Sequence, residues 1–216
     1  MMNQHRVFVR LSASAEKAGL RLVAKHDARW LCWAESLPFA PSDLFDGMFL
    51  LGDTIYFPSP KWCRDNPELA WKSLAAKMVV SEDVQAWTPY LFYPLYLFPQ
   101  SLSLLAVLAL WKSPWWALFL LALLPWPAPF RKRVEMRACA MLIAADYWLG
   151  KETVFPSLAM VQRFTGPSHY FMWPFKRQVR KELTDWSLLI ARRKSFGKLP
   201  YAAEVKFAIR IESVLR

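Results

Sequence analysis

The stretch ELAWKSLAAKMVVSEDVQAW, Glu68 to Trp87, predicts a long helix near the middle of the chain. It contains no Gly or Pro, it is rich in Ala, Leu, Lys and Glu, and it follows Pro67, a residue that favours the first turn of a helix. It also contains no histidine. The sequence around it decides what fold this helix belongs to and what task it has.

The residues before this helix predict a small β element. RVFVRL, residues 6–11, alternates polar and apolar side chains as a short strand does, and residues 20–35 fit a helix, or a strand followed by a helix. Residues 45–60 predict a β-hairpin broken at Gly52-Asp53, and the prolines that follow it indicate an edge strand.

After residue 130 the pattern is helical. Apolar residues recur at helical spacing in 131–149, 175–194 and 201–216, and TGPSHYFMWP, residues 165–174, is a turn-rich connector. We therefore expect a mainly α protein with a small β element, of the α+β class. Its parts are 1–87, 88–130 and 131–216, and they are expected to form one structural unit.

Residues 88–130 are almost entirely apolar, and Lys112 is their only charged residue. The runs 90–111 and 114–130 predict an apolar helical hairpin that dips into or crosses a bilayer, although the prolines make the second run marginal as a span of about 20 residues. A hairpin buried inside an oligomer or a larger assembly fits the same sequence. Four tryptophans are candidates for insertion into a membrane or a partner: Trp111, Trp115, Trp116 and Trp126.

The positive charge is concentrated after this segment. The whole chain carries +11, and residues 131–216 hold 17 Lys and Arg against 7 Asp and Glu, which is +10. This balance predicts an anionic partner, either membrane lipid or nucleic acid, although a core helix with a solvated basic face would look alike. The candidate contacts are Arg131, Lys132, Arg133, Lys176, Arg177, Arg180 and Lys181.

The sequence offers little for catalysis. It has three histidines in no metal-binding spacing, no nucleophile motif and no phosphate-binding Gly-rich loop, so we expect no cofactor and no metal. Three distant cysteines indicate no disulfide framework, and the N-terminus has no apolar core of a cleaved signal peptide. Glu135 and Asp146 share a helix but lie about 16 Å apart along its axis, too far to act on one bond. The ordinary interpretation of Glu135 is a surface residue that pairs with Arg131 or Arg137.

The order of the pieces resembles small zincin-like metallopeptidases of tailed phages and prophages. The resemblance runs from Gly52 to Tyr147, over the strand TIYFP, the helix after PELAWKSLA, the apolar hairpin and RVEMRACAM. In that family the central helix carries His-Glu-x-x-His and a later helix supplies a Glu as third zinc ligand. The resemblance places these four positions on Ala76, Lys77, Val80 and Glu135, so two ligands and the general base are absent.

Zinc peptidases need a metal that lowers the pKa of its bound water and a Glu that accepts the proton. The resemblance therefore implies a pseudoenzyme, with Lys77 and Glu135 as an ion pair where the metal would lie. We expect a non-catalytic structural or interaction protein in the virion or at the host cytoplasmic membrane. Its partners would be lipid, other virion proteins or a second copy. Two alternatives remain: a membrane-bound metallopeptidase that uses other ligands, such as His169 with Glu135, and a basic nucleic-acid-binding module.

Overall fold

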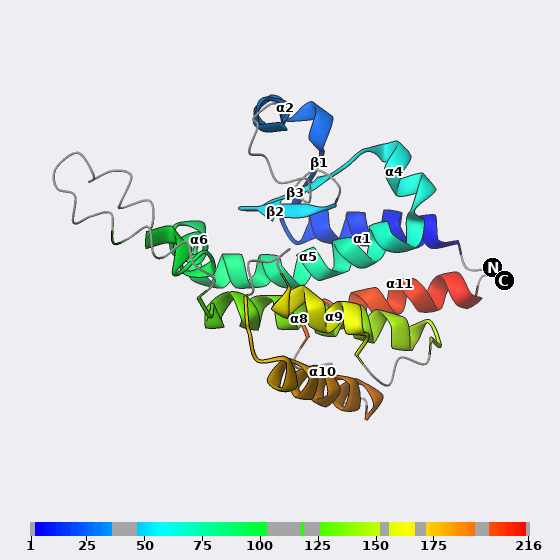
Figure 1. The fold of residues 1–216 in the computed structure, drawn as a ribbon. Coiled ribbons are helices and arrows are strands. Elements are labelled where there is room, and N and C mark those ends of the chain that lie inside the picture. The colour runs from blue at the N-terminus through cyan, green and yellow to red at the C-terminus, as the bar shows by residue number, and fades with distance from the viewer. Residues whose placement is uncertain are drawn as a thin grey trace.

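The structure is a computed structural model, and it describes residues 3–35, 47–102, 118, 126–151, 156–166, 172–192 and 199–214. Over these residues the chain is mainly helical with a small sheet, so the predicted α+β class is confirmed. The long helices α5 (Pro67–Trp87) and α8 (Pro129–Trp148) lie side by side at the centre, and the other elements pack around them (Figure 1).

Helix α5 confirms the helix predicted over 68–87. Pro67 opens it, where a missing N–H costs nothing. It ends at Trp87 because Thr88 adopts a positive φ of 59° and Pro89 follows. A helix that is apolar on most sides must be covered by other elements on most sides. Helix α5 meets this requirement, since other helices and β2 pack against it. Its buried residues are Ala70, Trp71, Leu74, Ala75, Ala76, Met78, Val79, Val80, Ser81 and Val84.

The strand predicted over 6–11 is wrong, because these residues belong to α1 (Gln4–Lys17). Val7, Leu11 and Ala15 recur every four residues and are buried, whereas Val9 is exposed. Six residues are too few to distinguish the period of a strand from that of a helix, and the apolar stripe that α1 packs on α5 shows that the helical period holds.

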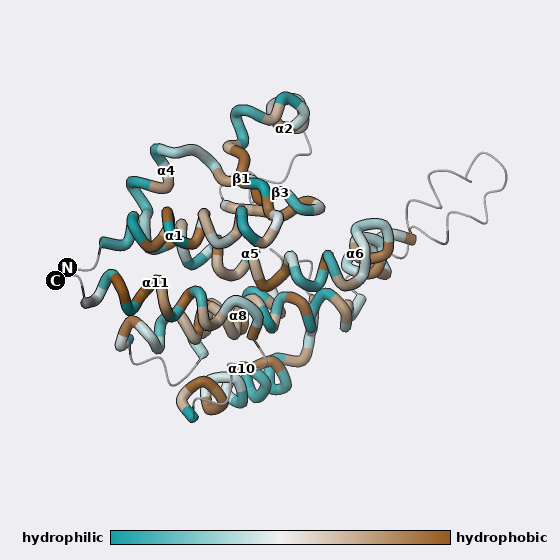
Figure 2. Tube along the Cα trace, turned by 180° about the vertical axis from the view of Figure 1, so that it is seen from behind, coloured by the Kyte–Doolittle hydropathy of each residue, from teal (hydrophilic) through white to brown (hydrophobic). Residues whose placement is uncertain are grey.

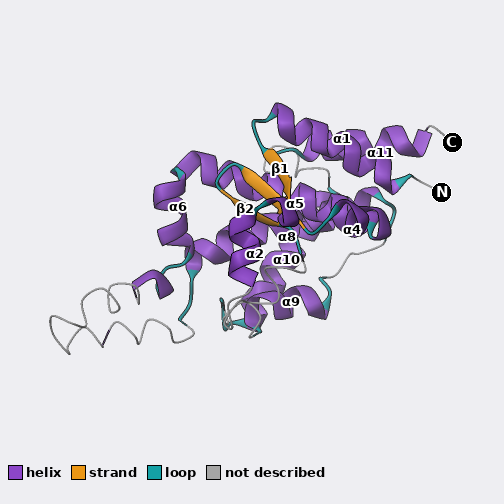
Figure 3. Cartoon of the chain, turned by 90° about the horizontal axis from the view of Figure 1, so that it is seen from above, coloured by secondary structure: helices purple, strands orange, loops and turns teal. Residues whose placement is uncertain are grey.

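The sheet contains β1 (Arg21–Ala24), β2 (Phe49–Leu51) and β3 (Thr54–Phe57) in the order β1-β3-β2. The predicted hairpin is confirmed: β2 and β3 are antiparallel, and Gly52 turns between them with a positive φ. The predicted edge strand is wrong, because β1 pairs in parallel with the far side of β3 and makes β3 central. The sheet lies above α5 (Figure 3), which β2 contacts.

Short helices extend the N-terminal half. The strand-then-helix reading of residues 20–35 is the correct one, since α2 follows β1 after a 3₁₀ turn. Ser59 caps α4 by accepting a hydrogen bond from the Trp62 N–H at 3.0 Å. The bounds are η1 (Lys25–Asp27), α2 (Arg29–Glu35) and α4 (Pro60–Asp65).

The three helical stretches predicted after residue 130 are found as α8, α10 (Lys176–Ala191) and α11 (Ala202–Val214), and α9 (Leu158–Thr165) is added. Helix α10 packs on α8, and α11 packs on α1 and α8. One hydrophobic core cluster contains residues from Val7 to Ile209, so both ends of the sequence contribute to it.

Helix α6 (Pro89–Tyr96), followed by η2 (Gln100–Leu102), lies at the end of the α5–α8 pair opposite the N- and C-termini (Figures 1 and 2). Phe92 attaches it to the body: its ring is buried, stacks on Tyr96 and meets Phe130 of α8 edge-on. In the part of the chain that is described, no helix combines the length and hydropathy needed to span a membrane.

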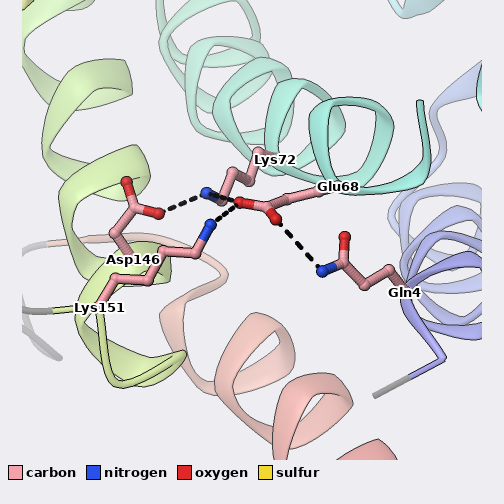
Figure 4. A network of polar contacts seen from close by, with 5 residues as sticks. All are labelled: Gln4, Glu68, Lys72, Asp146 and Lys151. Atoms are coloured by element: carbon pink, nitrogen blue, oxygen red, sulfur yellow. Dashed lines mark hydrogen bonds and ion pairs between the residues drawn. The ribbon is translucent and has the colours of Figure 1, made fainter. Parts of the chain in front are cut away.

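A polar network joins the helices at the opposite end (Figure 4). Glu68 of α5 accepts hydrogen bonds from Lys72, Lys151 and Gln4, and Lys72 also pairs with Asp146 of α8. The bonds from Lys151 and Lys72 lower the pKa of Glu68 from 4.5 to about 2. The charged form of Glu68 therefore stabilises the fold at neutral pH.

We predict that Glu68→Gln lowers the free energy of unfolding by about 1 kcal/mol at pH 7, since one third of this side chain is exposed and solvent screens it. Because the folded-state pKa is depressed, wild-type loses this contribution as the pH falls from about 4.5 to about 2. Urea unfolding at a series of pH values should show the two proteins converging over that range. Asp185→Asn, at an exposed carboxylate of α10, is the control and should leave the wild-type profile unchanged; a constant gap at all pH values would contradict the prediction.

Candidate functional site

Six side chains from four helices meet beside the central helix pair, and we name this group the Glu135 cluster. It brings together one residue of α5, one of α6, three of α8 and one of α9. Their hydrogen bonds, ring contacts and electrostatic interactions connect them to one another. The members are Lys77, Tyr96, Arg131, Glu135, Cys139 and Arg163.

Glu135 is the centre of this cluster and is only 4% exposed. Its Oε1 accepts a hydrogen bond from the Tyr96 hydroxyl at 2.5 Å, and its Oε2 pairs with Arg163 Nη2 at 3.1 Å. The interpretation of Glu135 as a surface residue is therefore wrong. Arg137, one of its expected partners, pairs instead with Glu82 and Asp83 of α5.

Lys77 extends from α5 toward this carboxylate. Burial lowers the pKa of its ammonium group, and the repulsion by Arg163 acts in the same direction, while the attraction of Glu135 opposes both. Among the described residues no carboxylate comes within 4 Å of the Lys77 amine. The direct ion pair expected for Lys77 is thus formed by Arg163, and Lys77 contributes at longer range.

Two members of the cluster, Cys139 and Tyr96, carry no charge at neutral pH. Burial raises the pKa of the Cys139 thiol to about 11. Burial, followed by the negative charge of Glu135, raises the pKa of the Tyr96 hydroxyl well above its usual range. Arg131 lies over the Tyr96 ring, with 5.2 Å between its guanidinium carbon and the ring centroid.

Ala76 and Val80 lie next to this cluster in a separate apolar one. They are buried with Val84 of α5, Phe92 of α6, and Val134 and Ala138 of α8. In the described part of the chain, no three His, Cys, Asp or Glu side chains are grouped to hold a metal ion. His169 lies outside the described residues.

A second candidate surface is exposed at α6, and we name it the apolar tip. Its side chains are Tyr90, Leu91, Leu95, Leu97 and Phe98, and Tyr90 is 90% exposed. Trp126, half-exposed, precedes α8, whereas Trp111, Trp115 and Trp116 lie outside the described residues. Such a group of large apolar side chains in water is typical of an interaction site.

The predicted basic contacts divide into two groups. Arg131 belongs to the Glu135 cluster, and Lys132 is buried, where it pairs with Glu182 at 2.5 Å and lies 4.4 Å from the centroid of the Trp173 ring. Lys132 is therefore not available to a flat anionic surface, which corrects that expectation, whereas Arg131 is only partly buried. The exposed cations are Arg133 of α8 and, on α10, Lys176, Arg177, Arg180 and Lys181.

A pocket of about 620 Å³ lies beside the contact between α8 and α10, with Trp173 and Trp186 in its wall. Four of its lining side chains contact one another. Trp173 Nε1 donates to Gln178, Gln178 donates to Glu182, and Glu182 accepts from Lys132, whose amine faces the Trp173 ring.

Sequence reasoning missed Tyr96, Cys139 and Arg163. Tyr96 occurs within an apolar run, Cys139 within an Ala- and Met-rich helix, and Arg163 on a short amphipathic helix where an arginine normally faces water. Only the packing of α9 on the cluster reveals the role of Arg163, and no local signal predicts it.

We predict that Arg163→Met lowers the free energy of unfolding by about 2 kcal/mol, because it leaves the buried Glu135 carboxylate without its cation. Full burial of the pair would give about 3–5 kcal/mol, but one third of Arg163 is exposed. Chemical denaturation measures the change. Glu82→Gln, which breaks an exposed pair with Arg137, should cost less than about 1 kcal/mol. Equal losses in the two variants would show that Glu135 is not held as described.

Comparison with known proteins does not assign the chain to a family. No protein-family model, no curated protein and no solved structure matches it. Its function is therefore inferred from the Glu135 cluster and the apolar tip.

Proposed function

We propose that this chain is a non-catalytic interaction protein that associates with a membrane surface through the apolar tip. The exposure of Tyr90, Leu91 and Leu95 on the short helix α6, and of Leu97 and Phe98 directly after it, carries the proposal. Transfer of one large apolar side chain from water to an apolar environment is favourable by about 1.5–3 kcal/mol. Several such side chains together therefore supply a useful affinity for lipid.

The dimensions of α6 favour insertion at the interface. Eight helical residues rise about 12 Å, against about 30 Å for the hydrocarbon core of a bilayer. Residues 88–130 contain only one charge, so the chain adjoining α6 is equally apolar in sequence. Trp87 and Trp126 are exposed at the two ends of this segment, and tryptophan is enriched where lipid meets water.

Exposed cations lie close to the same end of the molecule. The Lys132–Glu182 ion pair holds the N-terminal half of α10 against the first turns of α8, which begins three residues after Trp126. Lys176, Arg177, Arg180 and Lys181 belong to that half of α10 and are exposed. Apolar insertion beside basic residues is the usual mode of binding to anionic lipid.

The proposal of a non-catalytic role rests on the Glu135 cluster. At the positions where the zincin resemblance requires two histidines and a general base, the chain has buried Ala76 and Val80 and a lysine. We propose a zincin-like scaffold that has exchanged a metal for Arg163 as the partner of Glu135. The resemblance suggests a tailed phage or prophage as the setting, where a virion-associated or membrane-associated component needs only its binding surfaces.

Flotation with vesicles tests the membrane role. We expect the wild-type chain to float with vesicles containing phosphatidylglycerol, and Tyr90→Ser/Leu91→Ser/Leu95→Ser to float about tenfold less, since its apolar contribution to binding is removed. Leu158→Ser/Phe207→Ser is the matched control, because each of its side chains is 65% exposed away from α6. Loss of flotation in the control alone, or no flotation of wild-type, would refute the proposal.

Restoring the missing motif tests the zincin-like scaffold. Ala76→His/Lys77→Glu/Val80→His should bind about one zinc per chain, since Glu135 would complete a set of three ligands. Adding Glu135→Gln to this variant should lower its zinc content, measured by atomic emission on the dialysed protein. A folded triple variant that retains no zinc would count against the scaffold, with circular dichroism as the check on folding.

A further inference from the structure

The Glu135 cluster contains more cations than anions. Lys77, Arg131 and Arg163 surround Glu135, and the described residues place no second carboxylate within ion-pair distance of these three side chains. Cys139 and Tyr96 remain protonated at neutral pH, so they add no negative charge. With all three basic groups protonated, the cluster carries a net charge of +2.

Two donors in the same cluster have no acceptor among the described residues. Arg131 Nε and Arg163 Nε are both buried, and neither makes a hydrogen bond within that part of the chain. An unsatisfied buried donor costs about 1–3 kcal/mol, and nearly all such groups in native proteins have a partner. The unpaired N–H groups and the excess of positive charge therefore indicate the same missing component, an anion with hydrogen-bond acceptors.

We propose that the Glu135 cluster is a binding site for a small oxyanion of the phosphate class. Guanidinium and ammonium groups are the usual protein partners of phosphate oxygens, and this site supplies two of the first and one of the second. Arg163 is one-third exposed and gives an anion access to the cluster from solvent, while the Lys77 amine is buried behind the surface. The inference does not rest on the membrane role.

Glu135 has a defined part in this site. Its carboxylate orients Arg163 through the 3.1 Å ion pair and accepts a hydrogen bond from the Tyr96 hydroxyl, while its negative charge opposes a second anion. Replacing this carboxylate by a neutral amide of the same shape should therefore strengthen oxyanion binding. A merely structural role of Glu135 predicts the opposite result, a loss of oxyanion affinity in the amide variant.

Lys77 links binding to protons. Burial favours the neutral form of its amine in the free protein, and a bound oxyanion would favour the ammonium form. Binding should then take up protons and tighten as the pH falls, with sulfate as the probe because its charge is constant over the range used.

Calorimetric titration of the full chain with inorganic phosphate, at constant ionic strength and with chloride as the reference, tests the site. We expect saturable phosphate binding that weakens about tenfold in Lys77→Met, which removes one charge-assisted contact and leaves both described partners of Glu135 in place. Arg163→Gln should weaken it similarly, and Glu135→Gln should tighten it severalfold.

The matched control is Arg137→Gln, a guanidinium on the same helix that Glu82 and Asp83 already neutralise, and it should bind phosphate like wild-type. A short-chain phosphatidate below its micelle concentration is the second probe: tighter binding than inorganic phosphate identifies a lipid headgroup as the source, and weaker binding identifies free phosphate. No binding of either probe to wild-type, or an equal loss in Arg137→Gln and Lys77→Met, overturns the proposal whatever the outcome of flotation.

Discussion

The packing of α5 against α8 is the contact on which the rest of the molecule depends. Trp71, Leu74 and Met78 of α5 are fully buried, and so are Cys139 and Met141 of α8. Because α5 is covered by α1 on another side, and α8 by α10 and α11, these two helices connect every layer of the fold. The sheet, the apolar tip and the Glu135 cluster are all positioned by this pair.

The same helix pair explains why the cluster tolerates buried charge. An isolated charge is rarely buried, because the free energy of its lost hydration exceeds that of its new interactions. A buried ion pair is stable only when its geometry is good. Glu135 satisfies both of its oxygens with partners from α6, which packs on α5 and α8, and from α9, which packs on α10. Here the positive charge that holds Glu135 is supplied by an arginine.

The long elements could be predicted because the spacing of apolar residues is consistent over many positions. The helix over 68–87 has no breaker within it and a proline at its start, and the hairpin at Gly52 has a turn residue between two short β-branched or aromatic runs. The short segment 6–11 was assigned to the wrong class, because Val7 and Val9 alternate locally and only the burial of Leu11 and Ala15 in the fold shows the helical face.

The cluster was only partly predictable for a related reason. Glu135 and Lys77 attracted notice through a resemblance, but a sequence pattern describes one helix at a time. Arg163 joins them from a helix 28 residues further along the chain, and Lys132 was assigned to the surface although its ion pair with Glu182 spans 50 residues. Contacts between elements determine which charged side chains are buried. Only the charged side chains that stay exposed are available to a partner.

Tyr96 belongs to two regions at once, since it is the last residue of the helix that forms the apolar tip and a hydrogen-bond donor to Glu135. A molecule that prefers one position of α6 therefore also prefers one state of the Glu135 carboxylate and its cations. By thermodynamic reciprocity, occupancy of one region changes the affinity of the other by the same factor whenever Tyr96 moves. The phenol ring is thus the contact through which a displacement of α6 would reach the buried carboxylate.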